Sequence, residues 1–201
     1  TSKKMQSGST WDDVKMPSYS SLEGDLHVDV AIIGGGITGI TAVYLLSKTG
    51  LKVCLLEKSK LCFGATGVTT AFLTQNIDTR IGDLIDIYGK RDTRVVLDSH
   101  KWAIDSVERI VRKNKIDCDF ERCVNYVCAM DDGDLEELRS EEKLARDMGM
   151  QAKIKKGSLG FRSKEYMEIR EQAKFHPLRY LSALTRTAAR ERRCIRPPAA
   201  L

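Results

Sequence analysis

The 201-residue sequence has few of the residues that build metal centres or disulfide frameworks. It contains three histidines and six cysteines. Cys118, Cys123 and Cys128 are spaced C-x4-C-x4-C, with no C-x-x-C pair and no histidine nearby, so the spacing indicates no zinc or iron–sulfur site. Because six cysteines are sparse for a secreted scaffold and no secretory signal is visible, we expect free thiols in a reducing cytoplasm.

Most of the chain also lacks an excess of either charge. The formal net charge is +5, and the segment from Arg179 to Leu201, with six Arg and one Glu, accounts for all of it. The electrically neutral remainder predicts no nucleic-acid partner. The run Val28–Leu46 is largely apolar, but four glycines and Asp29 interrupt it, so we expect no membrane insertion.

What the sequence does contain is a strand–glycine turn–helix–strand unit near its start. Residues 28–33 are short, apolar and β-branched, as in a buried strand. Residues 37–48 predict a helix that ends at Gly50, and residues 51–57 predict a second buried strand. This order is the first half of a parallel α/β sheet.

The turn between the first strand and the helix reads Gly34-Gly-Gly36-Ile-Thr-Gly39, a G-x-G-x-x-G motif. Gly34 permits the tight turn, Gly36 lets backbone N–H groups approach a pyrophosphate, and Gly39 lets the helix pack closely on the sheet. The pyrophosphate then lies at the positive end of the helix dipole. A glycine-rich turn without a ligand is the alternative, and the agreement of the surrounding strands and helix disfavours it.

Glu57 ends the second strand, 18 residues after Gly39. A carboxylate there can accept hydrogen bonds from both hydroxyls of an adenosine ribose and repels a 2′-phosphate. Lys58 follows it directly and could soften that repulsion. The acid at this spacing therefore strengthens the prediction of a dinucleotide site and argues against an NADP-type ligand.

The next segment bears on the choice between FAD and NAD. Residues 63–71, Phe-Gly-Ala-Thr-Gly-Val-Thr-Thr-Ala, are small and rich in hydroxyls. Such a segment can lay hydroxyl and N–H groups along the second phosphate and the ribityl chain of a flavin. It favours FAD, although a generic surface loop and an NAD-dependent dehydrogenase remain as alternatives.

Residues 28–58 and 64–73 together resemble the amino-terminal part of the FAD-dependent oxidoreductases of the D-amino-acid-oxidase and glycine-oxidase superfamily. Residues 21–25, 116–120 and 173–178 resemble one bacterial branch, whose members often continue into a Rieske iron–sulfur domain. The resemblance implies hydride transfer to FAD from a small amine or amino-acid-like substrate, with an electron-acceptor partner. It identifies no catalytic side chain.

Carried over residue by residue, the resemblance implies three groups of cofactor contacts. The pyrophosphate is held at the glycine turn, the ribose at the end of the second strand, and the second phosphate or flavin side at the hydroxyl-rich segment. The implied residues are, in that order, Gly34, Gly36, Ile37, Thr38 and Gly39; Glu57 and Lys58; and Thr66, Thr69, Thr70 and the backbone near Leu73.

The expected fold class is α/β, a Rossmann-like FAD-binding ββα-type parallel sheet with the beginning of an inserted α+β substrate domain. The predicted parts are an arm over 1–26, the FAD-binding part over 27–120, the start of the insertion over 121–172, a return helix over 173–188 and a basic tail over 189–201. Because the tail loses apolar periodicity and the family's later elements do not follow, we expect an incomplete fold. An inactive nucleotide-binding fragment is therefore the third alternative.

Weaker patterns predict the remaining elements. Residues 58–80 read as an ordered loop or short helix, and Trp11 and Tyr19 are expected to pin the arm. Helices are predicted over 82–98 and 100–115, over 134–148 with Asp134 as a cap, and from Pro177 onward. Strands are predicted over 124–130, 153–155 and 160–163.

Overall fold

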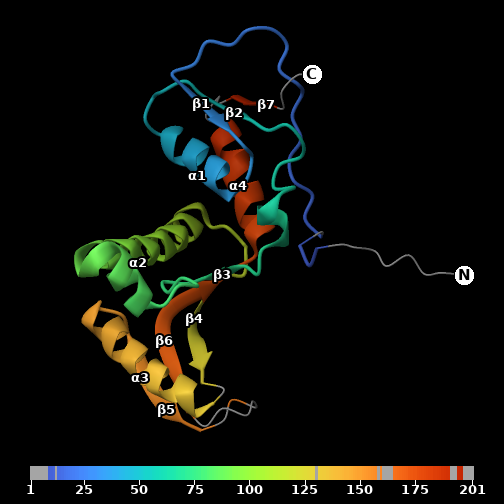
Figure 1. The fold of residues 1–201 in the computed structure, drawn as a ribbon. Coiled ribbons are helices and arrows are strands. Elements are labelled where there is room, and N and C mark those ends of the chain that lie inside the picture. The colour runs from blue at the N-terminus through green and yellow to red at the C-terminus, as the bar shows by residue number, and fades with distance from the viewer. Residues whose placement is uncertain are drawn as a thin grey trace, which may run out of the picture. The chain divides into compact units, whose positions relative to one another are not determined.

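The chain folds as two units whose segments alternate along the sequence (Figure 1). The computed structural model describes residues 9–11, 13–129, 131–157, 159, 165–190 and 194–196. Unit 1 comprises Thr1–Ala71, Lys115–Cys118 and His176–Leu201, and unit 2 comprises Phe72–Asn114 and Asp119–Phe175. No helix among the described residues is long and apolar enough to cross a membrane.

Unit 1 is built on a parallel sheet. Its strands β1 (Val30–Ile33), β2 (Val53–Leu56) and β7 (Cys194–Arg196) lie in the order β1-β2-β7. Helix α1 (Ile37–Leu46) connects β1 to β2, and the register pairs Val30 with Val53. The predicted strand–glycine turn–helix–strand unit is thus confirmed, with each element slightly shorter than its expected range.

Helix α4 (Pro177–Arg190) packs beside α1 in the same unit (Figure 1). Its apolar side chains repeat every three to four positions, which puts them on one helical face. Tyr180, Leu181 and Leu184 are fully buried, as is Tyr44 of α1. This packing is what holds α1, and therefore the glycine turn before it, in place.

The end of the chain departs from the sequence prediction. Residues 189–201 were expected to be a tail outside the fold, yet α4 continues to Arg190 and residues 194–196 form β7. The backbone of β7 pairs in parallel with β2, Cys194 opposite Cys54. Three residues are too few to show strand periodicity, so the pairing is decided by the free edge of β2 rather than by local sequence.

Unit 2 is an antiparallel sheet centred on β6 (Glu165–Lys174). Strand β4 (Glu121–Cys128) pairs with one side of β6 along most of its length. On the other side, β5 (Ala152–Lys156) pairs with the first half of β6 and the short β3 (Phe72–Leu73) with its end. The predicted strands over 124–130 and 153–155 are confirmed with shifted bounds. The third predicted strand, over 160–163, lies outside the described residues.

Two helices cover the apolar face of this sheet. Helix α3 (Asp132–Asp147) begins after Asp131, whose side chain accepts a hydrogen bond from the Asp134 N–H, so Asp131 rather than the expected Asp134 is the cap. Helix α2 (Ile81–Asn114) is the other. The buried core between these elements consists of Ile81, Leu97, Ala129, Leu138, Ala145, Met148, Met150, Ala152, Met167 and Ile169.

Helix α2 replaces the two helices predicted over 82–98 and 100–115. Its interruption lies at Gly89, where φ is 77° and ψ is 161°, and not at residue 99. Only glycine adopts this backbone conformation readily, whereas nothing at Ser99 prevents a helix from continuing.

The predicted domain boundaries differ from the observed division. Residues 72–114 were assigned to the FAD-binding part but belong to unit 2, and residues 173–175 were assigned to the return helix but complete β6 and unit 2. The cause is the paired strand β3, which is too short to be recognised from sequence and which begins unit 2 at Phe72. A 3-10 helix, η1 (Ala65–Val68), is the short helix expected within 58–80.

Candidate dinucleotide site

The glycine turn between β1 and α1 has the close geometry that its sequence predicts. Gly34 has a φ of 104°, a left-handed conformation that side chains disfavour. A Cβ added at Gly39 would clash with the Gly34 carbonyl oxygen and lie 3.1 Å from Cδ1 of Leu55 in β2. The first glycine therefore makes the turn, and the third lets α1 press against the sheet.

The start of α1 presents backbone donors beside a hydroxyl. Gly36 is the N-cap and provides no side-chain cap. The Ile37 N–H donates a hydrogen bond of 3.1 Å to Oγ1 of Thr66 in η1, and a Cβ added at Gly36 would lie 3.0 Å from the same oxygen. Since the first N–H groups of a helix lack intrahelical partners and carry its positive dipole, this end attracts an anion. Thr38 in the first turn is exposed.

Glu57 lies directly after β2, close to the glycine turn. Its Oε2 accepts a hydrogen bond of 2.7 Å from the Gly35 N–H, and its Oε1 accepts one of 2.8 Å from the Ser59 N–H. These two bonds fix the carboxylate. Each carboxylate oxygen can accept more than one hydrogen bond, so both can still receive ribose hydroxyls.

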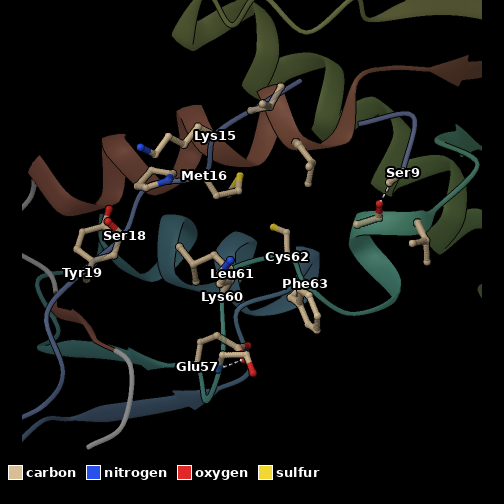
Figure 2. A pocket seen from close by; sticks show the side chains of 16 residues that line it. Ser9, Lys15, Met16, Ser18, Tyr19, Glu57, Lys60, Leu61, Cys62 and Phe63 are labelled. Carbon is tan, nitrogen blue, oxygen red and sulfur yellow. Dashed lines mark hydrogen bonds between the residues drawn. The ribbon is translucent and has the colours of Figure 1, made fainter. Parts of the chain in front are cut away.

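A cavity of about 750 Å³ lies next to Glu57 within unit 1 (Figure 2). It is lined by residues 14–19 and 59–63 together with Ser9, Glu57, Gly67, Val68 and Leu178. Its volume falls in the range of small-molecule and cofactor sites. The Glu57 carboxylate, the last two residues of η1 and this cavity therefore belong to one region of unit 1.

Cys62 lies on the wall of the same cavity but is not poised to react. Its side chain is 4% exposed, and its thiol points to the Gly35 carbonyl oxygen at 3.7 Å. Burial, with a smaller contribution from the negative charge of Glu57, raises the pKa of the thiol to about 12. The thiolate needed for nucleophilic attachment to a ligand is therefore scarce at neutral pH.

Only some of the cofactor-binding residues predicted from the sequence lie near the start of α1. Gly34, Gly36, Ile37, Gly39, Glu57 and Thr66 surround the start of α1 and the end of β2. Thr69 uses its hydroxyl to accept a bond from the Ala71 N–H, and Thr70 and Lys58 are exposed. Leu73 belongs to β3 of unit 2, where it pairs with Ala173.

Two parts of the cavity wall were not anticipated. Ser59 and Lys60 line it, whereas the neighbouring Lys58 does not. Residues 14–19 of the arm line it as well. The sequence predicted that Trp11 and Tyr19 pin the arm, and Trp11 does bond to the Thr69 carbonyl oxygen. The apolar pattern of Val14, Met16, Pro17 and Tyr19, which are half-buried, is too short to predict a place in a cavity wall.

The parallel sheet, the glycine turn and the terminal acid define a dinucleotide-binding α/β protein. A family model described as FAD dependent oxidoreductase matches residues 29–196, and the chain belongs to this family. The match includes β7. It confirms the prediction of an FAD-dependent oxidoreductase family, whose cofactor is FAD, and favours that prediction over the NAD alternative.

Individual relatives agree with this assignment. YhfW of Bacillus subtilis, named as a Rieske 2Fe-2S iron-sulfur protein, is 34% identical over 170 residues, which cover 84% of this chain and 33% of YhfW. Gamma-glutamylputrescine oxidoreductase of Escherichia coli is 26% identical over 129 residues, 64% of this chain and 30% of that protein.

Among solved structures, glycine oxidase from Geobacillus kaustophilus matches with a TM-score of 0.69 at 18% identity, over 85% of this chain and 46% of that one. L-amino acid deaminase from Proteus myxofaciens matches with a TM-score of 0.69 at 19% identity, over 91% of this chain and 41% of that one. These likenesses establish the fold. The chain spans about a third of the length of the curated relatives above and less than half of these structures.

Proposed function

We propose that the chain is the FAD-binding part of an oxidoreductase that acts on a small amine or amino-acid-like substrate. The observation that carries the proposal is the fixed Glu57 carboxylate beside the start of α1 and a cavity of cofactor size. The names of the relatives, a gamma-glutamylputrescine oxidoreductase and a glycine oxidase, support the substrate class. Bound FAD would supply the two-electron acceptor for a hydride from a substrate C–H bond.

The residues of this chain would bind and orient the cofactor. In this proposal Gly34, Gly36, Ile37, Thr38 and Gly39 hold the pyrophosphate with Thr66, while Glu57, with Lys58 nearby, receives the ribose hydroxyls. Thr69, Thr70 and the backbone near Leu73 remain predicted contacts to the flavin side. The positive end of α1 supports the phosphate assignment, because an anion there lies in the field of the helix dipole.

We also propose a reducing, cytoplasmic location and a separate electron acceptor. A reducing compartment is supported by five cysteines among the described residues that form no disulfide with one another: Cys54, Cys62, Cys118, Cys123 and Cys128. The Rieske name of YhfW supports an iron–sulfur group as the class of acceptor.

The test of the cofactor assignment is the ligand that the 201-residue chain binds at equilibrium. We expect added FAD to bind, with a change in its two-band absorption spectrum on titration with the protein, and an excess of NADH to leave that binding unchanged. A colourless protein that binds NADH selectively would instead identify the NAD alternative. No binding of either nucleotide would leave an inactive fragment.

The phosphate position is tested with Gly36→Asp. Aspartate is a favourable N-cap residue, so the variant should fold, but its carboxylate would take the phosphate's place and repel it. The matched control is Gly82→Asp, which adds the same charge to the first turn of α2, where an added Cβ meets only ordinary contacts. We expect FAD binding to be lost in the first variant and kept in the second. Near-native FAD affinity in folded Gly36→Asp would contradict the proposal that the phosphate lies at the start of α1.

A further inference from the structure

The amino-terminal arm is fastened to the segment that follows Thr66. Ser9 Oγ donates a hydrogen bond of 2.5 Å to the Gly67 carbonyl oxygen, and Trp11 Nε1 donates one of 2.9 Å to the Thr69 carbonyl oxygen. Both acceptors lie in or next to η1, whose Thr66 touches the start of α1. The arm is thereby tied to the segment that flanks the phosphate position.

A second set of contacts fastens the arm to α4. Asp13 Oδ1 lies 3.2 Å from His176 Nε2, and Asp13 Oδ2 accepts a hydrogen bond of 3.3 Å from Arg179. The Trp11 ring meets the His176 ring edge-on, with centroids 4.8 Å apart. Ser9, Trp11 and Asp13 therefore form a clasp with two anchors, one at residues 67–69 and one at residues 176–179.

Beyond the clasp, the arm forms one wall of the cavity. Met16, Pro17 and Tyr19 are half-buried and line it, and Leu61 and Glu57 line it from the segment after β2. Figure 2 shows Lys15 and Met16 on one side of this region and Glu57 on the opposite side. Apolar side chains on a cavity wall suit the face of a planar base, and Lys15 and Lys60 add positive charge for a diphosphate.

We propose that the arm, residues 9–11 and 13–19, forms part of the wall of the cofactor site, closes over the adenosine end of FAD and slows its release. The adenosine end is the part concerned because Glu57, the proposed ribose ligand, lines the same cavity as the arm. The inference rests on the proposed function. It goes beyond it by assigning a binding role to a segment that precedes the sheet and contains none of the glycine-turn residues.

Because Trp11 and Asp13 do not line the cavity, substituting them tests the arm without changing the cavity wall. Trp11→Phe keeps an aromatic ring, smaller than the indole, but removes the Nε1 donor, and Asp13→Asn keeps the shape but removes the charge that faces His176 and Arg179. The matched controls are Trp102→Phe, on an exposed tryptophan of α2, and Glu23→Gln, on an exposed arm residue outside the cavity. Thermal unfolding is measured first, to check that all four variants fold.

Dissociation of FAD and FMN is then measured by flavin fluorescence, and dissociation of ADP by the rate at which added FAD replaces it. We expect FAD and ADP to leave Trp11→Phe and Asp13→Asn about tenfold faster than the controls, as the loss of one good hydrogen bond predicts. FMN, which has no adenosine, should be unaffected. Unchanged FAD and ADP release, or tighter binding in the clasp variants, would overturn the inference, the latter because the arm would then compete with the ligand.

A second measurement reads the arm directly. Trypsin cleaves after the exposed Lys15, and saturating ADP should slow this cleavage without slowing cleavage after the exposed Lys90 of unit 2. Equal cleavage at Lys15 with and without ADP contradicts the inference. If the chain binds ADP but not FAD, the proposed function fails while the arm is still tested, and if it binds neither, both fail.

Discussion

The Glu57 carboxylate has a structural role in the loop after β2 and a proposed role in binding the ribose. Its two oxygens already accept the backbone N–H groups of Gly35 and Ser59, which stabilises the loop after β2. Their remaining lone pairs are the ones proposed for the ribose. A substitution at this position therefore affects the loop and the ligand together, and an experiment has to separate the two effects.

Glu57→Gln separates them through the choice of ligand. The amide keeps one acceptor but turns the other into a donor, which faces a backbone N–H or a ribose hydroxyl. We expect FAD affinity to fall by about 1.5–3 kcal/mol, the contribution of a hydrogen bond to a charged group, and FMN affinity to stay unchanged because FMN has no adenosine ribose. Titration of each flavin by fluorescence checks this, with Glu136→Gln on the exposed side of α3 as the control. An equal loss for both flavins would refute the ribose role.

Cys62 allows a prediction about pH. Its pKa of about 12 lies above the ordinary value of 9.0, so the folded chain holds this proton while the unfolded chain releases it. The contribution of Cys62 to stability is therefore complete below pH 9 and declines as the pH rises from about 9 to 12. We expect Cys62 in the native chain to resist iodoacetamide at pH 8 and to react fully in denaturant, as read by peptide mass spectrometry. Rapid native labelling would show that the thiol is more acidic and more accessible than its burial implies.

At the scale of elements, the kink in α2 depends on Gly89. An added Cβ there meets no atom within 4 Å, so any cost of a side chain comes from the backbone conformation alone. We expect Gly89→Ala to lower the free energy of unfolding by about 1–3 kcal/mol. Ser99→Ala, on an exposed helical position of α2, should change it by less than about 0.5 kcal/mol. Denaturant unfolding measures both, and equal stabilities would mean that α2 straightens at no cost.

The sequence was sufficient for β1, α1 and β2 because each has strong local signals. Two apolar β-branched runs flank a glycine motif, and Gly34 and Gly39 are needed for reasons that act within a few residues. The same applies to Glu57, whose place at the end of β2 follows from its position in the chain.

Strand β6 was missed for the opposite reason. Its sequence, Glu165-Tyr-Met-Glu-Ile-Arg-Glu-Gln-Ala-Lys174, is rich in residues that favour helices, and only Met167 and Ile169 mark its buried face. Pairing with β4, β5 and β3 overrides that preference, and such pairing joins segments that are distant in sequence. The arm's place in the cavity wall was hidden likewise, because it depends on contacts to residues 67–69 and 176–179.

At the scale of the whole molecule, the chain contains the glycine turn, the terminal acid and a cavity, but only three strands of parallel sheet among its described residues. β1 is an edge strand of that sheet, and its last residue, Ile33, is 87% exposed. The solved relatives are more than twice as long as the part that this chain matches. An exposed apolar residue on an unpaired edge is a site where a further strand would be stabilising.

We therefore expect the 201-residue chain to bind FAD weakly, to show no oxidase turnover and to tend to aggregate. A polypeptide extended through the downstream reading frame to the length of the relatives should bind FAD stoichiometrically and unfold at a higher temperature, because bound ligand stabilises the folded state. Flavin content after desalting and thermal unfolding compare the two. Stoichiometric FAD and one cooperative transition in the short chain would contradict this expectation.

The division of unit 1 into three segments has a consequence for biosynthesis. β2 leaves the ribosome early, but its neighbour β7 and the helix α4 that packs on α1 are translated only after all of unit 2. Nearly all of unit 2, by contrast, follows in one stretch from Phe72 to Phe175, so its segments are complete before α4 exists. Since domains fold as units during synthesis, we expect unit 2 to fold before unit 1, although synthesis of unit 1 begins first. The nascent chain carries its nucleotide-binding motif from the start and gains the partner that holds α1 in place only at the end.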